Sequence, residues 1–247
     1  MARRVLITFD VDGTLMQSTG PRSNSLHKRA FSAAFLQVFG VEGSIDVITH
    51  HGSTDPLIIL NTLEYYGIPQ ETAAPKLPEL KAKMVEYAKQ HSSEVGEGLE
   101  ILPGVLPLLD ALSRRNDVII GLVTGNLEEI GWLKMEALGI RQFFSVPNFG
   151  GFGSDDSNRG ELVKIAACRA EQSFPGGFRL HAHVGDTPND IQAAEYGGAV
   201  AIGVCTGIFS REVLHEASHK EKPAIILENL TNIQNFLSVC GLPEGDF

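Results

Sequence analysis

Five short hydrophobic runs along the chain have the pattern of β-strands that are buried on both faces. None of them alternates cleanly between apolar and polar positions. They cover residues 5–9, 118–123, 180–184, 199–204 and 224–227. Continuous apolar runs of this length are typical of parallel sheets, in which helices cover both faces. The pattern therefore predicts a parallel sheet built from segments that are far apart in the sequence.

Segments with helical periodicity separate these runs. Over residues 163–174, apolar side chains recur at every third or fourth position and charged side chains occupy the other faces. A second helix is expected from about Asn126, a good N-cap residue, to Gly139, and Thr231 is expected to cap the last helix. Strands that alternate with helices predict right-handed βαβ units. The expected fold class is therefore α/β, with a doubly wound, Rossmann-like parallel sheet as its core.

One region breaks this alternation. Residues 16–98 show only helical periodicity and no strand of the buried type, and Asp55-Pro56 is a dipeptide that begins helices. Glycines flank this region on both sides. We expect an inserted helical cap over residues 16–98, and an α/β core made of residues 1–15 and 99–247. The alternative is that these helices simply pack on the sheet.

The composition limits the classes of protein and partner to be considered. The 247 residues are 43% hydrophobic and 20% charged, which is enough for a sizeable core in one domain with a smaller insertion. Twenty basic against thirty acidic side chains give a net charge of −10. A chain of this charge without a basic run is a poor candidate for binding nucleic acid or anionic lipid. An anionic substrate must therefore be bound by a local site.

Membrane insertion and secretion are not expected from the sequence. The longest run free of charged or strongly polar side chains, Tyr196–Cys205, is well short of the ~18 residues that a membrane helix requires. The apolar run 5–9 is too short for the core of a signal peptide. The three cysteines are far apart and odd in number, which favours reduced thiols in a cytoplasmic protein over a disulfide framework.

Two carboxylates follow the first expected strand, in the segment Asp10-Val11-Asp12-Gly13-Thr14. Side chains at i and i+2 of an extended segment project to the same side, and open α/β sheets bind their ligands where strands end. Two acidic groups this close repel each other unless a cation or a shared proton lies between them. A divalent ion would resolve this conflict and leave one oxygen of Asp10 free to attack. The alternative is an exposed acidic turn.

A second pair of carboxylates follows another expected strand. Asp186 lies at the strand end, and Asp190 follows about one helical turn later in a helix that Pro188 begins. Together with Asp10 and Asp12, these residues would form an oxygen-rich pocket of the type that Mg²⁺ prefers. The alternative is that Asp186 only caps the helix and that Asp190 is exposed.

Two further segments could bind a phosphate group near these carboxylates. Thr124-Gly125-Asn126 combines a hydroxyl, a flexible glycine and a helix N-terminus at a strand end. Arg159 precedes the helix around Val163, where its charge could neutralise a phosphate. The alternatives are that Asn126 is only an N-cap and that Arg159 is a surface residue. Lys164 is the rival cation.

These four segments, DVDGT, VTGN, a cation before a helix and GDTPND, resemble in order and spacing the haloacid dehalogenase-like hydrolase superfamily and its phosphoglycolate phosphatase-like subgroup. They extend from Asp10 to Asp190, so the resemblance covers nearly the whole chain. In that family the helical block after the first strand is a cap. The residue that matches Asp10 is the nucleophile and forms an aspartyl-phosphate, and the one that matches Asp12 is the general acid and base. Family members that act as dehalogenases lack an acid at that position.

The resemblance also implies roles for the remaining candidates. Thr124 would hold the phosphoryl oxygens, and Gly125 and Asn126 would line the same loop. Arg159 would replace the lysine that is usual in the family, and its forked head makes its role differ from that of lysine. The implied Mg²⁺ ligands are Asp10, the backbone carbonyl of Asp12, Asp186 and Asp190.

The resemblance implies a Mg²⁺-dependent phosphatase of a small phosphorylated metabolite, with no nucleic-acid or membrane partner. One alternative is a phosphotransferase or mutase that resembles β-phosphoglucomutase. Another is a catalytically silent binding protein, against which the complete set of acids argues. Several cap side chains could contact a substrate, namely Arg22, His27, Lys28, Arg29, His50 and His51. The identity of the substrate and the oligomeric state do not follow from the sequence.

Overall fold

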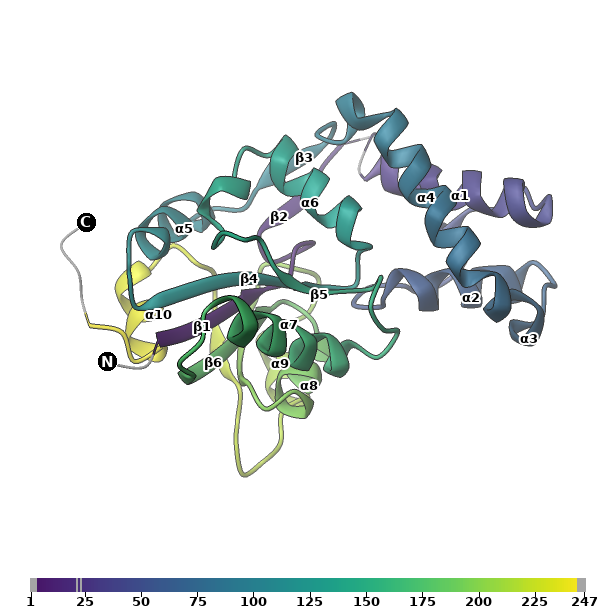
Figure 1. Cartoon of the computed structure of the whole chain (residues 1–247). Coiled ribbons are helices and arrows are strands. Elements are labelled where there is room, and N and C mark those ends of the chain that lie inside the picture. Colours follow the sequence, from purple (N-terminus) through teal and green to yellow (C-terminus); the bar gives the residue numbers. More distant parts are fainter. Residues whose placement is uncertain (1–3, 21, 23, 244–247) are drawn as a thin grey trace.

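A six-stranded parallel sheet forms the centre of the molecule (Figure 1). The computed structural model describes residues 4–20, 22 and 24–243. In spatial order, the strands are β5 (Gly150–Phe152), β4 (Val118–Thr124), β1 (Arg4–Phe9), β6 (Phe178–Gly185), β7 (Val200–Val204) and β8 (Ile225–Leu227). Every neighbouring pair in this sheet is parallel. The expected parallel sheet is therefore confirmed, and each of the five hydrophobic runs forms one of its strands.

Helices cover both faces of the sheet. One face packs against α5 (Val105–Ser113), α6 (Glu128–Ala137) and α10 (Ile233–Val239). The other face packs against α7 (Arg159–Ser173), α8 (Pro188–Tyr196) and α9 (Arg211–Glu216). This confirms the doubly wound α/β fold. Strand β4 is buried along its whole length, which explains why its sequence is continuously apolar.

The strand register brings the carboxyl ends of three strands together. Phe9, the last residue of β1, pairs with Leu122 of β4 on one side and with Val184 of β6 on the other. The loops that follow these strands therefore begin side by side at one edge of the sheet. They carry the segments 10–14, 124–126 and 186–190 of the sequence.

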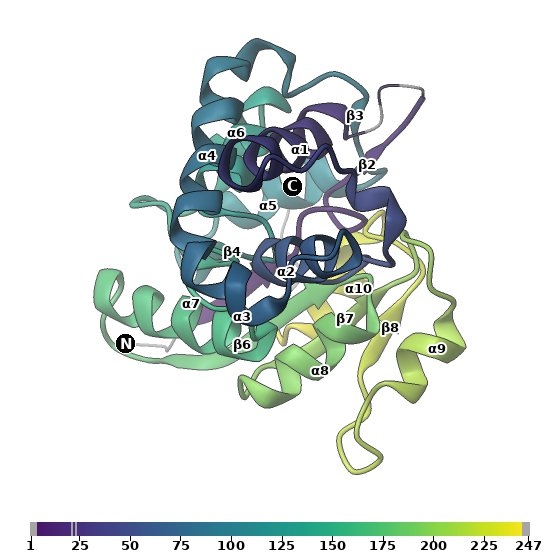
Figure 2. The ribbon, with the colours of Figure 1, turned by 90° about the vertical axis from the view of Figure 1, so that its right-hand side faces the viewer.

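The helices between β1 and β4 form a separate group with its own hydrophobic core. This group contains α1 (Ser25–Phe39), α2 (Asp55–Tyr65), α3 (Gln70–Ala73) and α4 (Leu77–Gln90), with the short helices η1 (Ile45–Val47), η2 (Ala74–Lys76) and η3 (Ser92–Glu94). We call residues 25–94 the helical unit. Its core includes the buried side chains of Phe31, Phe35, Ile59 and Met84. Figures 1 and 2 show these helices gathered at one end of the molecule.

The structure contains three short strands that were not expected. Strands β2 (Met16–Ser18) and β3 (Leu99–Ile101) pair antiparallel where the chain enters and leaves the helical unit, and β5 forms one edge of the main sheet. Residues 16–98 were expected to hold no strand of the buried type, and β2, with one buried, one exposed and one half-buried residue, is not of that type. Each of these strands has only three residues, too few for a periodic pattern, and backbone pairing defines them.

Two expected helix starts are also wrong. Helix α6 has Leu127 at its N-cap position, because the side chain of Asn126 is bound elsewhere. Helix α10 is capped by Asn232, whose side chain accepts a hydrogen bond from the backbone N–H of Asn235, and not by Thr231. Both predicted positions lie close to the observed start.

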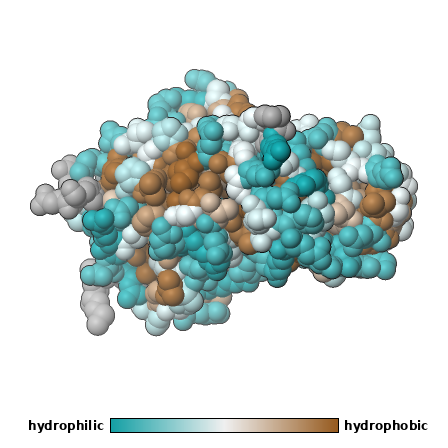
Figure 3. Space-filling view, turned by 90° about the horizontal axis from the view of Figure 1, so that it is seen from above, coloured by the Kyte–Doolittle hydropathy of each residue, from teal (hydrophilic) through white to brown (hydrophobic). Residues whose placement is uncertain are grey.

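Within the described residues, no helix combines the length and the apolar character that crossing a bilayer demands. Viewed from above, hydrophobic side chains gather on the half of the surface that covers the sheet, on the left of Figure 3. The half formed by the helical unit mixes apolar and polar side chains (Figure 3).

Candidate active site

Three buried carboxylates from different parts of the sequence meet at the carboxyl edge of the sheet. Asp10 directly follows β1, Asp186 follows β6, and Asp190 lies in the first turn of α8. One oxygen from each lies within 4.8 Å of the others. The exposed fractions are 4% for Asp10, 4% for Asp186 and 1% for Asp190. The convergence predicted for these three residues is therefore observed.

The start of helix α8 fixes the orientation of Asp190. The hydroxyl of Thr187 accepts a hydrogen bond from the backbone N–H of Asp190, and Oδ2 of Asp190 accepts from the backbone N–H of Thr187 at 3.0 Å. This is a capping box. Thr187, and not Asp186, is thus the N-cap residue. Both parts of the alternative interpretation, a capping Asp186 and an exposed Asp190, are wrong.

Arg159, the first residue of α7, joins two of these carboxylates. Its Nε donates a hydrogen bond to Oδ1 of Asp190 at 2.8 Å, and its Nη2 donates to Oδ1 of Asp10. Its Nη1 donates to the carbonyl of Gly52, in the helical unit, at 3.3 Å. Arg159 is only 9% exposed, so it is not a surface residue. Lys164, by contrast, is exposed and pairs with Glu161 on α7.

The charges in this cluster do not balance without a further cation. Burial and the neighbouring carboxylates raise the pKa of Asp10 to about 7 and that of Asp186 to about 8, although Arg159 opposes both shifts. Burial acts in the same direction on Asp190, but Arg159 and His183 outweigh it and lower the pKa of Asp190. Arg159 and His183 therefore keep Asp190 ionised, whereas Asp10 and Asp186 are left short of positive charge.

The donor set fits a hard divalent cation such as Mg²⁺. All three groups are carboxylates, which are the ligands that hard cations prefer, and their mutual repulsion disappears when a cation lies between them. Two glycines make room for Asp186. A Cβ atom at Gly13, whose φ is +90°, would lie 2.3 Å from Oδ2 of Asp186, and one at Gly207 would lie 1.8 Å from the same oxygen. The hydroxyl of Thr14 donates to Oδ1 of Asp186 at 3.1 Å.

Asp12 lies outside this cluster and is held by a different cation, Lys134. The Nζ atom of Lys134 is 2.8 Å from both carboxylate oxygens of Asp12. Nδ2 of Asn126 donates to Oδ2 of Asp12, also at 2.8 Å. Burial raises the pKa of Asp12, but Lys134 and Asn126 outweigh it and lower that pKa below its ordinary value. Asp12 is therefore an ionised carboxylate in a strong pair.

Lys134 is a site residue that the sequence reasoning missed. It lies in α6 and is 2% exposed. The available signal was its position four residues after Ile130, which places a lysine on the buried face of this helix. The prediction of a phosphate-binding cation considered only Arg159 and Lys164.

The loop after β4 lies between Asp12 and the helical unit. The hydroxyl oxygen of Thr124 is buried and accepts hydrogen bonds from the side chain and the backbone N–H of Asn126, at 2.7 and 3.3 Å. The carbonyl of Gly125 accepts a hydrogen bond from the backbone N–H of Asp55 at 2.8 Å. A Cβ atom at Gly125 would lie 2.4 Å from the carbonyl oxygen of Ser53, so only glycine allows this close approach.

Several further contacts hold the helical unit against the core. Asp55 accepts hydrogen bonds from Nε2 of His27 at 3.1 Å and from the backbone N–H of Leu127 at 2.8 Å. The side chain of Asp55 is almost completely buried. Asn189 of α8 donates to the carbonyl of Gly52 at 2.9 Å. Segment 52–55 of the helical unit thus lies directly over the carboxyl edge of the sheet.

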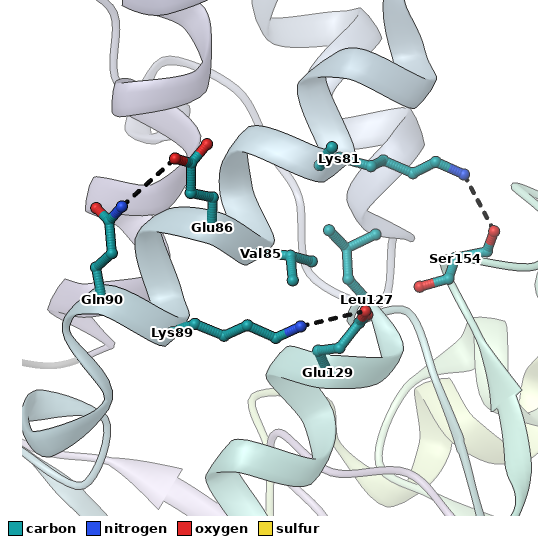
Figure 4. Close-up of a pocket in the computed structure, with 9 residues that line it drawn as sticks. Lys81, Val85, Glu86, Lys89, Gln90, Leu127, Glu129 and Ser154 are labelled. Carbon is teal, nitrogen blue, oxygen red and sulfur yellow. Dashed lines mark hydrogen bonds and ion pairs between the residues drawn. The ribbon is translucent and has the colours of Figure 1, made fainter.

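Between α4 and α6 lies a groove of about 550 Å³ (Figure 4). Lys81 donates to the carbonyl of Ser154 at 3.0 Å, and Lys89 lies 3.9 Å from Glu129. Figure 4 shows Val85 and Leu127 between these two contacts. A smaller cavity of about 370 Å³ lies beside Arg159, between Gly52 and α8.

Most of the basic side chains of the expected cap that could contact a substrate interact with other side chains of the protein instead. Arg22 pairs with Glu97, Lys28 with Asp46 and Arg29 with Glu94, all at the surface. His50 and His51 stack on each other. His27 is the member of the set that is buried.

Comparisons with known proteins show which families and structures this chain resembles. A family model described as haloacid dehalogenase-like hydrolase matches residues 5–198, which include the charged residues of the site from Asp10 to Asp190. The phosphoglycolate phosphatase of Salmonella typhi is 26% identical over 251 residues, covering 97% of this chain and 94% of that protein. That of Yersinia pseudotuberculosis is 27% identical over 242 residues, covering 96% and 94%.

Solved structures with a similar fold include a predicted phosphoglycolate phosphatase from Haemophilus somnus, with 20% identity, a TM-score of 0.59 and coverage of 94% of this chain and 96% of that chain. Another is a Thermotoga maritima protein provisionally identified as a β-phosphoglucomutase, with 19% identity, a TM-score of 0.53 and coverage of 96% and 99%. At such identities the structural likeness shows the fold alone. The family model spans well over half of the sequence, and the chain therefore belongs to the haloacid dehalogenase-like hydrolase family.

Proposed function

We propose that this protein is a Mg²⁺-dependent phosphatase that hydrolyses a small phosphorylated metabolite through an aspartyl-phosphate on Asp10. The observation that carries the proposal is the cluster of Asp10, Asp186 and Asp190 around Arg159 at the carboxyl edge of the sheet. This edge is where open α/β sheets bind ligands. The phosphatase relatives over nearly the full length of the chain support the same activity.

In the proposed first step, an oxygen of Asp10 attacks phosphorus and the bond from phosphorus to the leaving oxygen breaks. Asp12, which is ionised in the free protein, would first take the proton of the phosphomonoester monoanion and then give it to that leaving oxygen, which departs as an alcohol. In the second step, water attacks the phosphorus of the aspartyl-phosphate and Asp12 takes a proton of this water. The bond between phosphorus and the Asp10 oxygen breaks, so inorganic phosphate leaves and the carboxylate of Asp10 is restored. Splitting the hydrolysis in this way replaces one difficult step by two easier ones.

The remaining residues would bind and orient the phosphoryl group. Thr124, together with Gly125 and Asn126, would hold its oxygens through a hydroxyl and loop N–H groups. Arg159 would neutralise charge on the transferring group while it orients Asp10. The proposed holders of Mg²⁺ are Asp10, the backbone carbonyl of Asp12, Asp186 and Asp190, the last directly or through water. When bound, the ion would neutralise negative charge on the phosphoryl group.

The helical unit would act as a cap that excludes bulk water during the first step. Its segment 52–55 contacts both the loop after β4 and Arg159, which supports this role. We propose the division into a cap of residues 16–98 and a core of residues 1–15 and 99–247. The end residues 1–3 and 244–247 of this core lie outside the described residues.

The relatives support a small phosphomonoester, such as phosphoglycolate, as the substrate class. Cys168, Cys205 and Cys240 are free thiols, which supports a reducing compartment such as the cytoplasm. A mutase that resembles β-phosphoglucomutase would use the same core. Incubation with glucose 1-phosphate separates the two activities, because a phosphatase releases inorganic phosphate and a mutase forms glucose 6-phosphate.

The decisive experiment is a screen of phosphorylated metabolites with and without Mg²⁺, on the parent protein and on Asp10→Asn. We expect release of phosphate that depends on Mg²⁺ and is lost in Asp10→Asn. Asp110→Asn is the matched control, because Asp110 lies on the surface of α5 and pairs with Arg114. Turnover by Asp10→Asn at the parent rate would refute the role of Asp10. Beryllofluoride traps an aspartate nucleophile in a state that resembles the aspartyl-phosphate. If it does not trap Asp10 in this way, a catalytically silent binding protein is favoured.

A further inference from the structure

The buried lysine on α6 has surroundings that packing alone does not explain. Lys134 is the buried lysine among the residues that the structure describes, and its neighbours Trp132 and Met135 on α6 belong to the hydrophobic core. A buried ammonium group costs several kcal/mol unless it is paired and hydrogen-bonded. Lys134 meets this condition through Asp12 and Asn126, to which its Nζ atom donates at 2.8 Å.

The contacts of Lys134 and Asn126 hold Asp12 from one side. Lys134 binds both carboxylate oxygens, and Asn126 binds Oδ2 while it also donates to the hydroxyl of Thr124. Both side chains belong to the loop after β4 or to the helix that follows it. The side chain of Asp12 nevertheless remains 37% exposed. The carboxyl group is therefore fixed on one side and accessible on the other.

Lys134 differs in this respect from the other lysines near the helical unit. Lys81 and Lys89 contact groups at the mouth of the groove between α4 and α6, and Lys164 forms a pair on the surface of α7. None of these three contacts Asp12. The pairing with Asp12 is thus a particular feature of α6 and not a general effect of nearby basic residues.

We propose that Lys134 is a positioning residue, which with Asn126 holds the carboxyl group of Asp12 in the orientation from which it exchanges a proton with the leaving oxygen. This inference rests on the proposed phosphatase function. In that reaction the proton moves between Asp12 and either the leaving oxygen or the water. Lys134 neither gains nor loses a proton, and it does not contact the reacting phosphorus.

The test compares two leaving groups. 4-Nitrophenolate departs as a stable anion without a proton, whereas an alkoxide needs the proton of Asp12. The value of kcat/KM covers the steps up to the first cleavage, so it reports this difference directly. We would measure it for 4-nitrophenyl phosphate and for the best alkyl substrate among 2-phosphoglycolate, glycerol 3-phosphate and glucose 6-phosphate. The variants are Lys134→Met, Lys134→Gln and Lys134→Arg, and the matched control is Lys164→Met.

We expect Lys134→Met and Lys134→Gln to lose at least tenfold more in kcat/KM with the alkyl substrate than with 4-nitrophenyl phosphate. Lys134→Arg should recover part of the loss, and Lys164→Met should match the parent. A merely structural defect would lower kcat/KM for both substrates by the same factor. That result, or no loss of kcat/KM at all, would overturn the inference. Lys134→Gln, checked by circular dichroism, carries the test if Lys134→Met does not fold. A parent protein that hydrolyses none of these substrates would instead refute the proposed function.

Discussion

Replacing Asp186 by asparagine should remove part of the pH dependence of stability. The pKa of Asp186 is raised from 3.8 to about 8, by burial first and then by Asp190 and Asp10. Between these two values the folded protein keeps a proton that the unfolded chain has released. The stability that Asp186 contributes is therefore fully present below about pH 4 and is lost as the pH rises through about 8.

The size of the effect follows from the same shift. Each pH unit in this window costs up to about 1.4 kcal/mol. From pH 6 to pH 8, Asp186 alone should lower the free energy of unfolding of the metal-free protein by about 2 kcal/mol. For a chain of this length, that corresponds to a fall of about 4–8 °C in Tm. An asparagine does not ionise, and its Oδ1 can still accept the hydrogen bond of Thr14.

The assay is thermal unfolding in EDTA at pH 6 and pH 8, for the parent, Asp186→Asn and the surface control Asp110→Asn. We expect the fall in Tm to shrink by about half in Asp186→Asn, since the raised pKa of Asp10 still contributes. Asp110→Asn should behave as the parent. If Asp186→Asn loses as much Tm between pH 6 and pH 8 as the parent, the reasoning about the acidic cluster is refuted.

Three further predictions follow from the site. Mg²⁺ needs ionised ligands, so its binding should release protons from Asp10 and Asp186 at pH 7, and its affinity should increase between pH 6 and pH 8. Calorimetry in buffers of different ionisation enthalpy measures the number of protons released. A value of zero would contradict the prediction. Arg159→Lys should keep the charge but lose the simultaneous hydrogen bonds to Asp10 and Asp190, which should lower kcat about tenfold. Arg159→Met should lower kcat further. Equal kcat values for the two variants would contradict this prediction. Gly125→Ala should cost about 1–3 kcal/mol in the contact with Ser53. KM should then rise severalfold while the core fold persists by circular dichroism, and an unchanged KM would count against close packing of this segment.

The hydrophobic pattern predicted the sheet well because its strands are buried on both faces. Strands such as Val118–Thr124 are continuously apolar, and no amphipathic helix shares that pattern. Strand β8 also has three residues but lies in a predicted apolar run, whereas β2, β3 and β5 escaped prediction because their pairing partners define them. Met16, for example, is placed by its partner Ile101, which lies far along the chain.

The candidate site was predictable as far as it follows strand ends. Asp10, Thr124 and Asp186 each come directly after or at the end of a buried run, and the register of a parallel sheet brings such positions together. Arg159 was found through its place at the start of a helix. Lys134 was not found, because it lies in the middle of α6 and only the tertiary packing shows that its ammonium group points to Asp12.

Asn126 shows why a local rule can give the wrong use for a residue. Asparagine before a helix is usually a cap, and the sequence alone favours that use. Here its amide binds Asp12 and Thr124, while its side-chain carbonyl accepts from Lys134. The hydrogen bonds of Asn126 to these partners take the place of a capping hydrogen bond, and α6 begins without a side-chain cap.

The hydrogen bond from Nη1 of Arg159 to the carbonyl of Gly52 joins the helical unit directly to the carboxylate cluster. If the helical unit moves away to admit a ligand, as its proposed role as a cap requires, this donor loses its partner. The N–H group that had bound Gly52 would then be available to an incoming anion. On closure, the carbonyl of Gly52 and the bound anion would compete for this donor, so the same arginine would respond to whether the site is occupied.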